Sequence, residues 1–101
     1  MDARTTPNKW MLLKTGQTYK VFGTWSGGFA DPDSWKLNSG IEKVEDEGDC
    51  WLFHGFSGSV YQCHKQLWGT TGYGSAVLES WKEDIEVMSP DFDPMTLNKE
   101  D

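Results

Sequence analysis

Four residues near the middle of the chain carry side chains that bind metals or act as nucleophiles: Cys50, His54, Cys63 and His64. Zinc accepts these ligand types, but their spacing keeps them apart. Cys50 and His54 would lie about 13 Å apart along a strand, and strand neighbours such as Cys63 and His64 point to opposite faces. The same separation excludes a Cys–His catalytic dyad, because the thiol of such a dyad must hydrogen bond directly to the imidazole. We therefore predict no enzyme, no cofactor, and two reduced, buried thiols.

A β-hairpin must position these residues. Segments 50–56 and 60–66 flank Ser57-Gly58-Ser59, which we interpret as a three-residue loop with a glycine available for a positive φ. This loop sets Phe53 opposite Cys63 and gathers Trp51, Phe53, Tyr61 and Cys63 on one face. A two-residue loop would instead move every pair by one residue and exchange the faces of one strand.

In the three-residue register, His54 and His64 form a diagonal pair across the two strands. Their Cβ atoms would then lie about 7–8 Å apart on the more polar face of the hairpin. This pair is the candidate site for an alternative function, a metal-binding or small-ligand module. The other interpretation is two unrelated surface histidines.

Three further strands are expected before this hairpin. Residues 9–14 and 17–25 form a hairpin around Thr15-Gly16, and side chains in the second segment alternate with period two. Residues 41–44 form a short strand that leads into an acidic turn.

A helix is expected after the hairpin. Ser75 is placed to cap it, and at helical spacing Val77, Leu78, Trp81 and Ile85 share one apolar side. In an alternative interpretation, the helix ends near Lys82 and residues 85–88 form a last strand.

The predicted fold is therefore α+β, a small antiparallel β-meander of about five strands with one C-terminal amphipathic helix. The meander is either an open twisted sheet or curled into a small barrel of the SH3 or OB type. We expect the 101-residue chain to fold as one globular domain over residues 1–90, which begins with a loose polar arm. Residues 91–101 are expected to form an acidic, mobile tail. The predicted core consists of Trp10, Leu12, Tyr19, Val21, Trp51, Phe53, Tyr61, Cys63, Val77, Leu78 and Trp81.

Negative charge is concentrated in two segments of a chain whose net charge is −7. Residues 42–49 carry a net charge of −4 and residues 91–101 carry −3, so the remainder is neutral. Such a chain repels phosphate backbones, and we expect no direct binding to nucleic acid. It has no apolar run of the ~18 residues needed to cross a bilayer and no signal peptide. We therefore expect a cytoplasmic protein with no membrane contact.

Acidic and aromatic side chains together indicate a surface for a basic partner protein. Carboxylates spaced along a turn and a helix can occupy a groove built for phosphates, steered there by the field of the partner. The loop over residues 26–40 supplies two aromatic residues that either anchor this partner or fold back over the core. The candidate partner-binding residues are Glu45, Asp46, Glu47, Asp49, Phe29, Trp35, Glu79, Glu83 and Glu86.

A short, acidic, aromatic-rich chain without a catalytic constellation resembles, in type, the small phage-encoded inhibitors of host defence, anti-CRISPR and anti-restriction proteins among them. The resemblance implies a protein that binds and inhibits a larger, nucleic-acid-handling partner, and it assigns no residue roles. The alternatives are the His54/His64 module and a structural or assembly subunit that pairs through its sheet edges. The oligomeric state in solution separates the last of these from a monomeric inhibitor.

Overall fold

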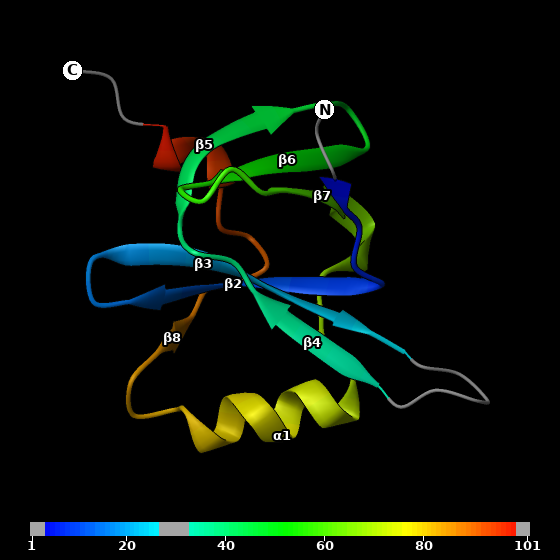
Figure 1. Ribbon diagram of the computed structural model, residues 1–101, viewed down its shortest axis with the longest axis vertical. Coiled ribbons are helices and arrows are strands. Elements are labelled where there is room, and N and C mark those ends of the chain that lie inside the picture. The colour runs from blue at the N-terminus through cyan, green and yellow to red at the C-terminus, as the bar shows by residue number, and fades with distance from the viewer. Residues whose placement is uncertain (1–3, 27–32, 99–101) are drawn as a thin grey trace.

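A computed structural model of the protein describes residues 4–26 and 33–98. Its strands form two four-stranded sheets (Figure 1). The outer sheet has the order β1 (Arg4–Thr5), β7 (Val60–His64), β6 (Cys50–Gly55) and β5 (Ile41–Asp46). The central sheet has the order β4 (Ser34–Leu37), β3 (Thr18–Trp25), β2 (Lys9–Thr15) and β8 (Glu86–Val87). The helical elements are η1 (Lys65–Leu67), α1 (Gly72–Ser80) and η2 (Pro94–Leu97).

The central sheet lies between the outer sheet and α1, so the molecule has three layers (Figure 1). Side chains along β2 and β3 alternate between the two faces of this sheet. Trp10, Leu12 and Val21 pack toward the outer sheet, whereas Leu13 and Phe22 pack toward α1. A strand buried on both faces needs apolar side chains at successive positions, which accounts for the uninterrupted apolar run at residues 10–13.

The predicted α+β class is confirmed, but the strands of the described residues form two sheets and no closed barrel. A barrel has a single interior, so it could not cover both faces of β2 and β3. The predicted arm at the N-terminus also contains a strand. There, β1 pairs in parallel with β7 through Arg4 opposite Val60 and Thr5 opposite Tyr61.

The hydrophobic core is divided between the two sides of the central sheet. Seven of the predicted core residues are buried, namely Trp10, Leu12, Val21, Phe53, Tyr61, Cys63 and Leu78. Four others are only partly buried, namely Tyr19, Trp51, Val77 and Trp81. The prediction missed Leu13, Phe22, Val44, Leu52 and Val60. Leu13 and Phe22 were missed because period-two alternation assigns one apolar face to a strand, and these strands have two.

The β6–β7 hairpin has the predicted faces but neither of the predicted registers. Phe53 lies opposite Tyr61 rather than Cys63, a shift of two residues. The loop consists of Phe56-Ser57-Gly58. A three-residue loop takes its positive φ at the third position, and Gly58, with φ of +94°, supplies it there. Because side chains alternate with period two, a two-residue shift leaves each on its predicted face.

Helix α1 begins earlier and ends earlier than the main prediction. Its N-cap is Thr71, whose hydroxyl accepts a hydrogen bond from Gly74 N–H at 3.0 Å, so Ser75 lies inside the helix. The helix ends well before Ile85, which leads into β8 as in the alternative interpretation. Gly74 packs closely on the central sheet, because a Cβ at this position would lie 2.7 Å from Thr24 Cγ2. None of the helices described here is long and apolar enough to cross a bilayer.

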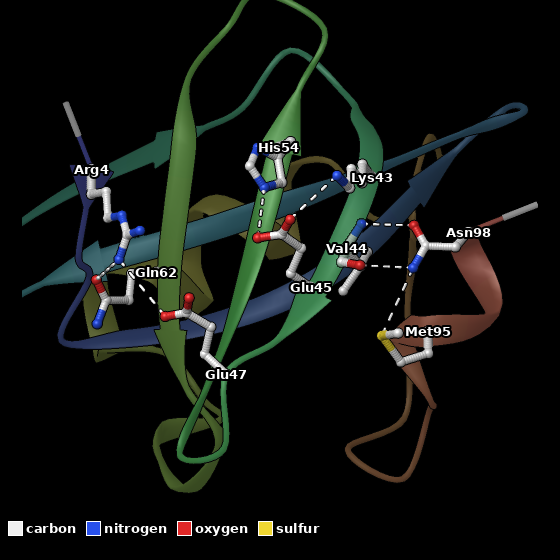
Figure 2. Close-up of polar contacts among 9 residues, drawn as sticks. All are labelled: Arg4, Lys43, Val44, Glu45, Glu47, His54, Gln62, Met95 and Asn98. Carbon is white, nitrogen blue, oxygen red and sulfur yellow. Dashed lines mark hydrogen bonds and ion pairs between the residues drawn. The ribbon is translucent and has the colours of Figure 1, made fainter. Parts of the chain in front are cut away.

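The predicted mobile tail is packed against the domain over residues 91–98, and its last three residues lie outside the described ranges. Phe92 stacks on Tyr19 with ring centroids 5.9 Å apart, and Leu97 packs on the core. Asn98 Oδ1 accepts a hydrogen bond from Val44 N–H at 2.8 Å, and Asn98 Nδ2 donates to Val44 O at 2.7 Å (Figure 2). The asparagine side chain therefore covers the edge of β5, where backbone groups would otherwise need another partner.

We predict that Asn98→Ala lowers the free energy of unfolding by about 1–3 kcal/mol, because it removes two hydrogen bonds from the partly buried backbone of Val44. Urea titration followed by tryptophan fluorescence measures this change. Asn98→Asp is the matched comparison, since it keeps the acceptor for Val44 N–H but sets a second acceptor against Val44 O, and it should also be less stable than the wild type. An unchanged unfolding midpoint for Asn98→Ala would show that the contact does not stabilise the domain.

Candidate functional site

Two of the predicted partner-binding acids, Glu45 and Glu47, already have partners within the chain (Figure 2). Glu45 Oε2 lies 3.2 Å from Lys43 Nζ, and its Oε1 lies 3.4 Å from His54 Nε2. The hydrogen bond from Lys43, followed by that from His54, lowers the pKa of Glu45. Glu47 lies 3.8 Å from the guanidinium of Arg4, which β1 brings to this side of the outer sheet.

Asp46 has the shortest ion pair of the acidic turn. Its Oδ1 lies 2.7 Å from Lys65 Nζ and also accepts a hydrogen bond from Gly48 N–H at 2.9 Å. Lys65 is held over the ring of Trp51, with Nζ 4.3 Å from the ring centroid. The hydrogen bond from Lys65 and then the one from Gly48 lower the pKa of Asp46. The carboxylate is therefore the form that the folded protein favours.

We predict that Lys65→Met raises the pKa of Asp46 toward the value of a free aspartate, because the methionine keeps the packing on Trp51 and removes the charge. Carbon-13 NMR of the aspartate carboxyl measures the pKa. Lys82→Met is the control, since Lys82 pairs with Glu79 at 3.0 Å, and it should leave Asp46 unchanged.

The lowered pKa of Asp46 also makes the stability of the fold depend on pH. A pKa that is lowered on folding stabilises the protein above the unfolded pKa, and the contribution is lost as pH falls through the folded pKa. In the wild type, the contribution of Asp46 should therefore persist at mildly acidic pH and be lost only as the pH falls through its lowered pKa. In Lys65→Met the part of this acid dependence that is due to Lys65 should disappear. An identical acid dependence in the two proteins would contradict the assignment.

The cations around the acidic turn reduce its charge. Lys65 and Arg4 bring the net charge of −4 for residues 42–49 down to −2. Asp49 and Glu42 are exposed, and neither has an ion pair among the described residues. The turn is therefore a mostly compensated cluster with two free carboxylates, rather than a uniformly acidic patch.

The predicted His54/His64 pair does not form. Because Phe53 lies opposite Tyr61, His54 lies opposite Val60 and His64 opposite Cys50. His54 and His64 are thus four positions apart along the ladder, about 13 Å at the rise of a strand. His64 Nδ1 instead accepts a hydrogen bond from Gln66 N–H at 3.2 Å, which caps η1. The shifted register removes the geometry on which the metal-binding alternative depended.

Both cysteines are free thiols in different environments. Cys63 is fully buried in the core between the sheets, whereas Cys50 is half-buried on the other face of the outer sheet. Burial, and then the nearby Cys50, raise the pKa of Cys63 well above its usual value. The thiolate is the reactive form of cysteine, so Cys63 is protected both sterically and electrostatically.

We predict that an excess of maleimide at neutral pH modifies Cys50 in the native protein and reaches Cys63 only on unfolding. Mass spectrometry of the labelled peptides over time distinguishes the two sites. A Cys63→Ala variant should keep the rapid phase and a Cys50→Ala variant should lose it. Equal labelling rates in the native protein would contradict the burial of Cys63.

Of the two aromatic residues predicted in the loop over residues 26–40, the structure describes only Trp35. Phe29 lies outside the described residues. Trp35 belongs to β4 and packs on the α1 side of the central sheet, with its ring centroid 5.7 Å from that of Phe22 and 5.0 Å from that of Trp81. Its ring is therefore folded back over the core, the second of the two sequence-based interpretations.

The predicted acidic helix face is divided among three elements. Glu79 lies on α1, Glu83 follows the end of the helix, and Glu86 belongs to β8. Helical spacing therefore does not relate them. Glu83 and Glu86 instead share an exposed stretch with Asp84, which the sequence interpretation missed. In the described part of the chain, none of the three acids in this 83–86 segment has a cation within 4.0 Å.

Two hollows adjoin the 83–86 segment, and Ile85 lines both of them. The larger, of about 410 Å³, is a groove between α1 and β8 lined by four apolar and four polar residues. The smaller, of about 280 Å³, is lined by Glu83, Asp84 and Glu86 together with Lys14. Only the tertiary structure reveals this combination, because the wall residues come from β2, α1 and β8.

Comparison with protein-family models, curated proteins and solved structures finds no significant match. Within residues 4–26 and 33–98, no group of three or more His, Cys, Asp or Glu side chains is arranged to hold a metal ion. A functional proposal for this chain therefore has to come from its own surface.

Proposed function

We propose that the protein is a non-enzymatic binding protein that occupies a basic site on a larger, nucleic-acid-handling partner. The 83–86 segment carries this proposal, because its three exposed carboxylates lack cations among the described residues. On a chain of net charge −7, such groups keep their full charge for an external surface and steer its approach.

The chemistry of the partner follows from this charge. Proteins that bind nucleic acid present Lys and Arg side chains to phosphates, and an acidic protein that fits the same groove competes for it. In this proposal the protein acts in the cytoplasm and itself contacts neither nucleic acid nor membrane. The concrete version that we favour is a phage-type inhibitor of host defence, such as an anti-CRISPR or anti-restriction protein.

The acidic turn contributes less than the 83–86 segment. To bind a partner, Glu45 or Asp46 would exchange an internal cation for an external one, so the net gain in free energy is small. Asp49 and Glu42 are free of that exchange, but they lie at the outer sheet and not beside the 83–86 segment.

We predict that tagged protein retains one stoichiometric partner from a lysate of its native host at low salt, and releases it as the salt concentration rises. Partners are identified by mass spectrometry, and affinities are then measured with the purified partner. The triple variant Glu83→Gln, Asp84→Asn and Glu86→Gln should bind about tenfold more weakly, because these charges meet the basic surface.

The matched control removes three other carboxylates that have no ion pair among the described residues, in Glu42→Gln, Asp49→Asn and Asp91→Asn. Both triple variants change the net charge equally, so only the position of the charge distinguishes them. Equal weakening by the two would assign the effect to net charge alone and remove the 83–86 segment as the contact. Recovery of the tagged protein without a partner would contradict the proposal.

A further inference from the structure

Apolar side chains of the α1 layer are exposed to solvent in the groove between α1 and β8. Met11 forms part of its floor, and Leu78, Ile85 and Val87 contribute its other main apolar walls. Val87 lies opposite Leu13 in the β2–β8 ladder, so its side chain is on the α1 face of the central sheet. It is nevertheless 40% exposed, because nothing in the described ranges covers this end of the layer.

The groove follows from two short elements. Strand β8 contributes only two residues to the central sheet, and α1 stops at Ser80 after nine residues. The layer that α1 forms over the central sheet is therefore too short to cover the edge at β8. An apolar groove of about 410 Å³ lies within the range of sites that take several apolar groups.

The charge around the groove is one-sided. Glu79 and Lys82 line it as a pair at 3.0 Å and cancel one another. Beyond Ile85, the carboxylates of Glu83, Asp84 and Glu86 surround the adjoining hollow. Lys14, which shares that hollow, makes no ion pair there among the described residues and has its Nζ 5.6 Å from the ring centroid of Tyr19.

We propose that this groove, together with the 83–86 segment, is a docking site for a basic amphipathic segment of a partner protein. Apolar side chains at helical spacing enter the groove over Met11 and Val87, and flanking Lys or Arg residues meet the adjoining carboxylates. This inference rests on the proposed function and adds to it an apolar anchor and a location. The anchor supplies affinity that charge alone does not give, since exposed ion pairs contribute little.

Charge complementarity selects this occupant over others. A second copy of the chain also carries a net charge of −7, which opposes its approach to an acidic rim. A nucleic acid is repelled for the same reason. A basic segment with apolar residues satisfies both the groove and its rim.

The test uses the 101-residue protein and two synthetic peptides. One is an amphipathic helix of leucine and lysine, and the other has every leucine replaced by glutamine at the same charge. Calorimetry gives the affinities, and NMR of the nitrogen-15-labelled protein locates the contact. The amphipathic peptide should bind about tenfold more tightly than the polar one and should shift amide signals over residues 75–87.

Two pairs of surface variants separate the groove from the charge. Val87→Glu and Ser75→Arg place a charge on opposite walls of the groove, and both should weaken binding of the amphipathic peptide about tenfold. Leu67→Glu is the control for Val87→Glu, because the exposed fractions of the two residues are 39% and 40%. Ala76→Arg is the control for Ser75→Arg, because Ala76 is the exposed neighbour of Ser75. A purely electrostatic effect would instead strengthen binding in Val87→Glu and weaken it in Ser75→Arg. Thermal melting of each variant verifies that it is folded.

The possible results show whether the groove proposal fails alone or together with the proposed function. Equal binding of both peptides, with variants that respond only to the sign of their charge, would overturn the groove and leave the acidic binding protein in place. Amide shifts confined to other surfaces would also overturn it. Failure of both peptides to bind at low salt would contradict the groove and the proposed preference for a basic partner together.

Discussion

The structure depends on the burial of one hairpin, β2–β3, on both of its faces. Leu12 and Val21 on one side and Leu13 and Phe22 on the other are fully buried, so the hairpin needs two separate covers. Losing a buried Phe or Leu costs about 2–5 kcal/mol, a large fraction of the stability of a small domain. The outer sheet and α1 are therefore both required, and the three-layer arrangement follows.

The edges of the sheets are completed by side chains as well as by strands. Asn98 satisfies both backbone groups of Val44 at the edge of β5. Asn38 also satisfies both backbone groups of Val21 beyond the end of β4: its side-chain Oδ1 accepts from Val21 N–H at 2.9 Å, and its backbone N–H donates to Val21 O at 3.1 Å. At the β8 end of the central sheet, the strand is short and the groove remains open. The same layer that stabilises the hairpin thus leaves the surface on which our functional proposals rest.

Charge has two roles in this molecule, and position decides which one a carboxylate has. Glu45 and Asp46 lie on β5, which also carries Lys43, and Lys65 begins η1 directly after β7, so their charge is used within the fold. The 83–86 segment lies where α1 has ended and β8 has barely begun, away from those cations. Its carboxylates have no cation within 4.0 Å among the described residues, which is why our proposal gives them more weight than the acids of the turn.

The sequence by itself determined part of the local structure: two strands, predicted at 9–14 and 17–25 and observed at Lys9–Thr15 and Thr18–Trp25, and the faces of the β6–β7 hairpin. These follow from side-chain period, glycine position and charge, which act over a few residues. Only the tertiary structure decided that β2 and β3 have two buried faces, that β1 pairs with β7, and that the expected tail covers β5. It also decided which acids meet cations and where the groove lies, because those contacts join residues distant in the chain and depend on how the layers pack.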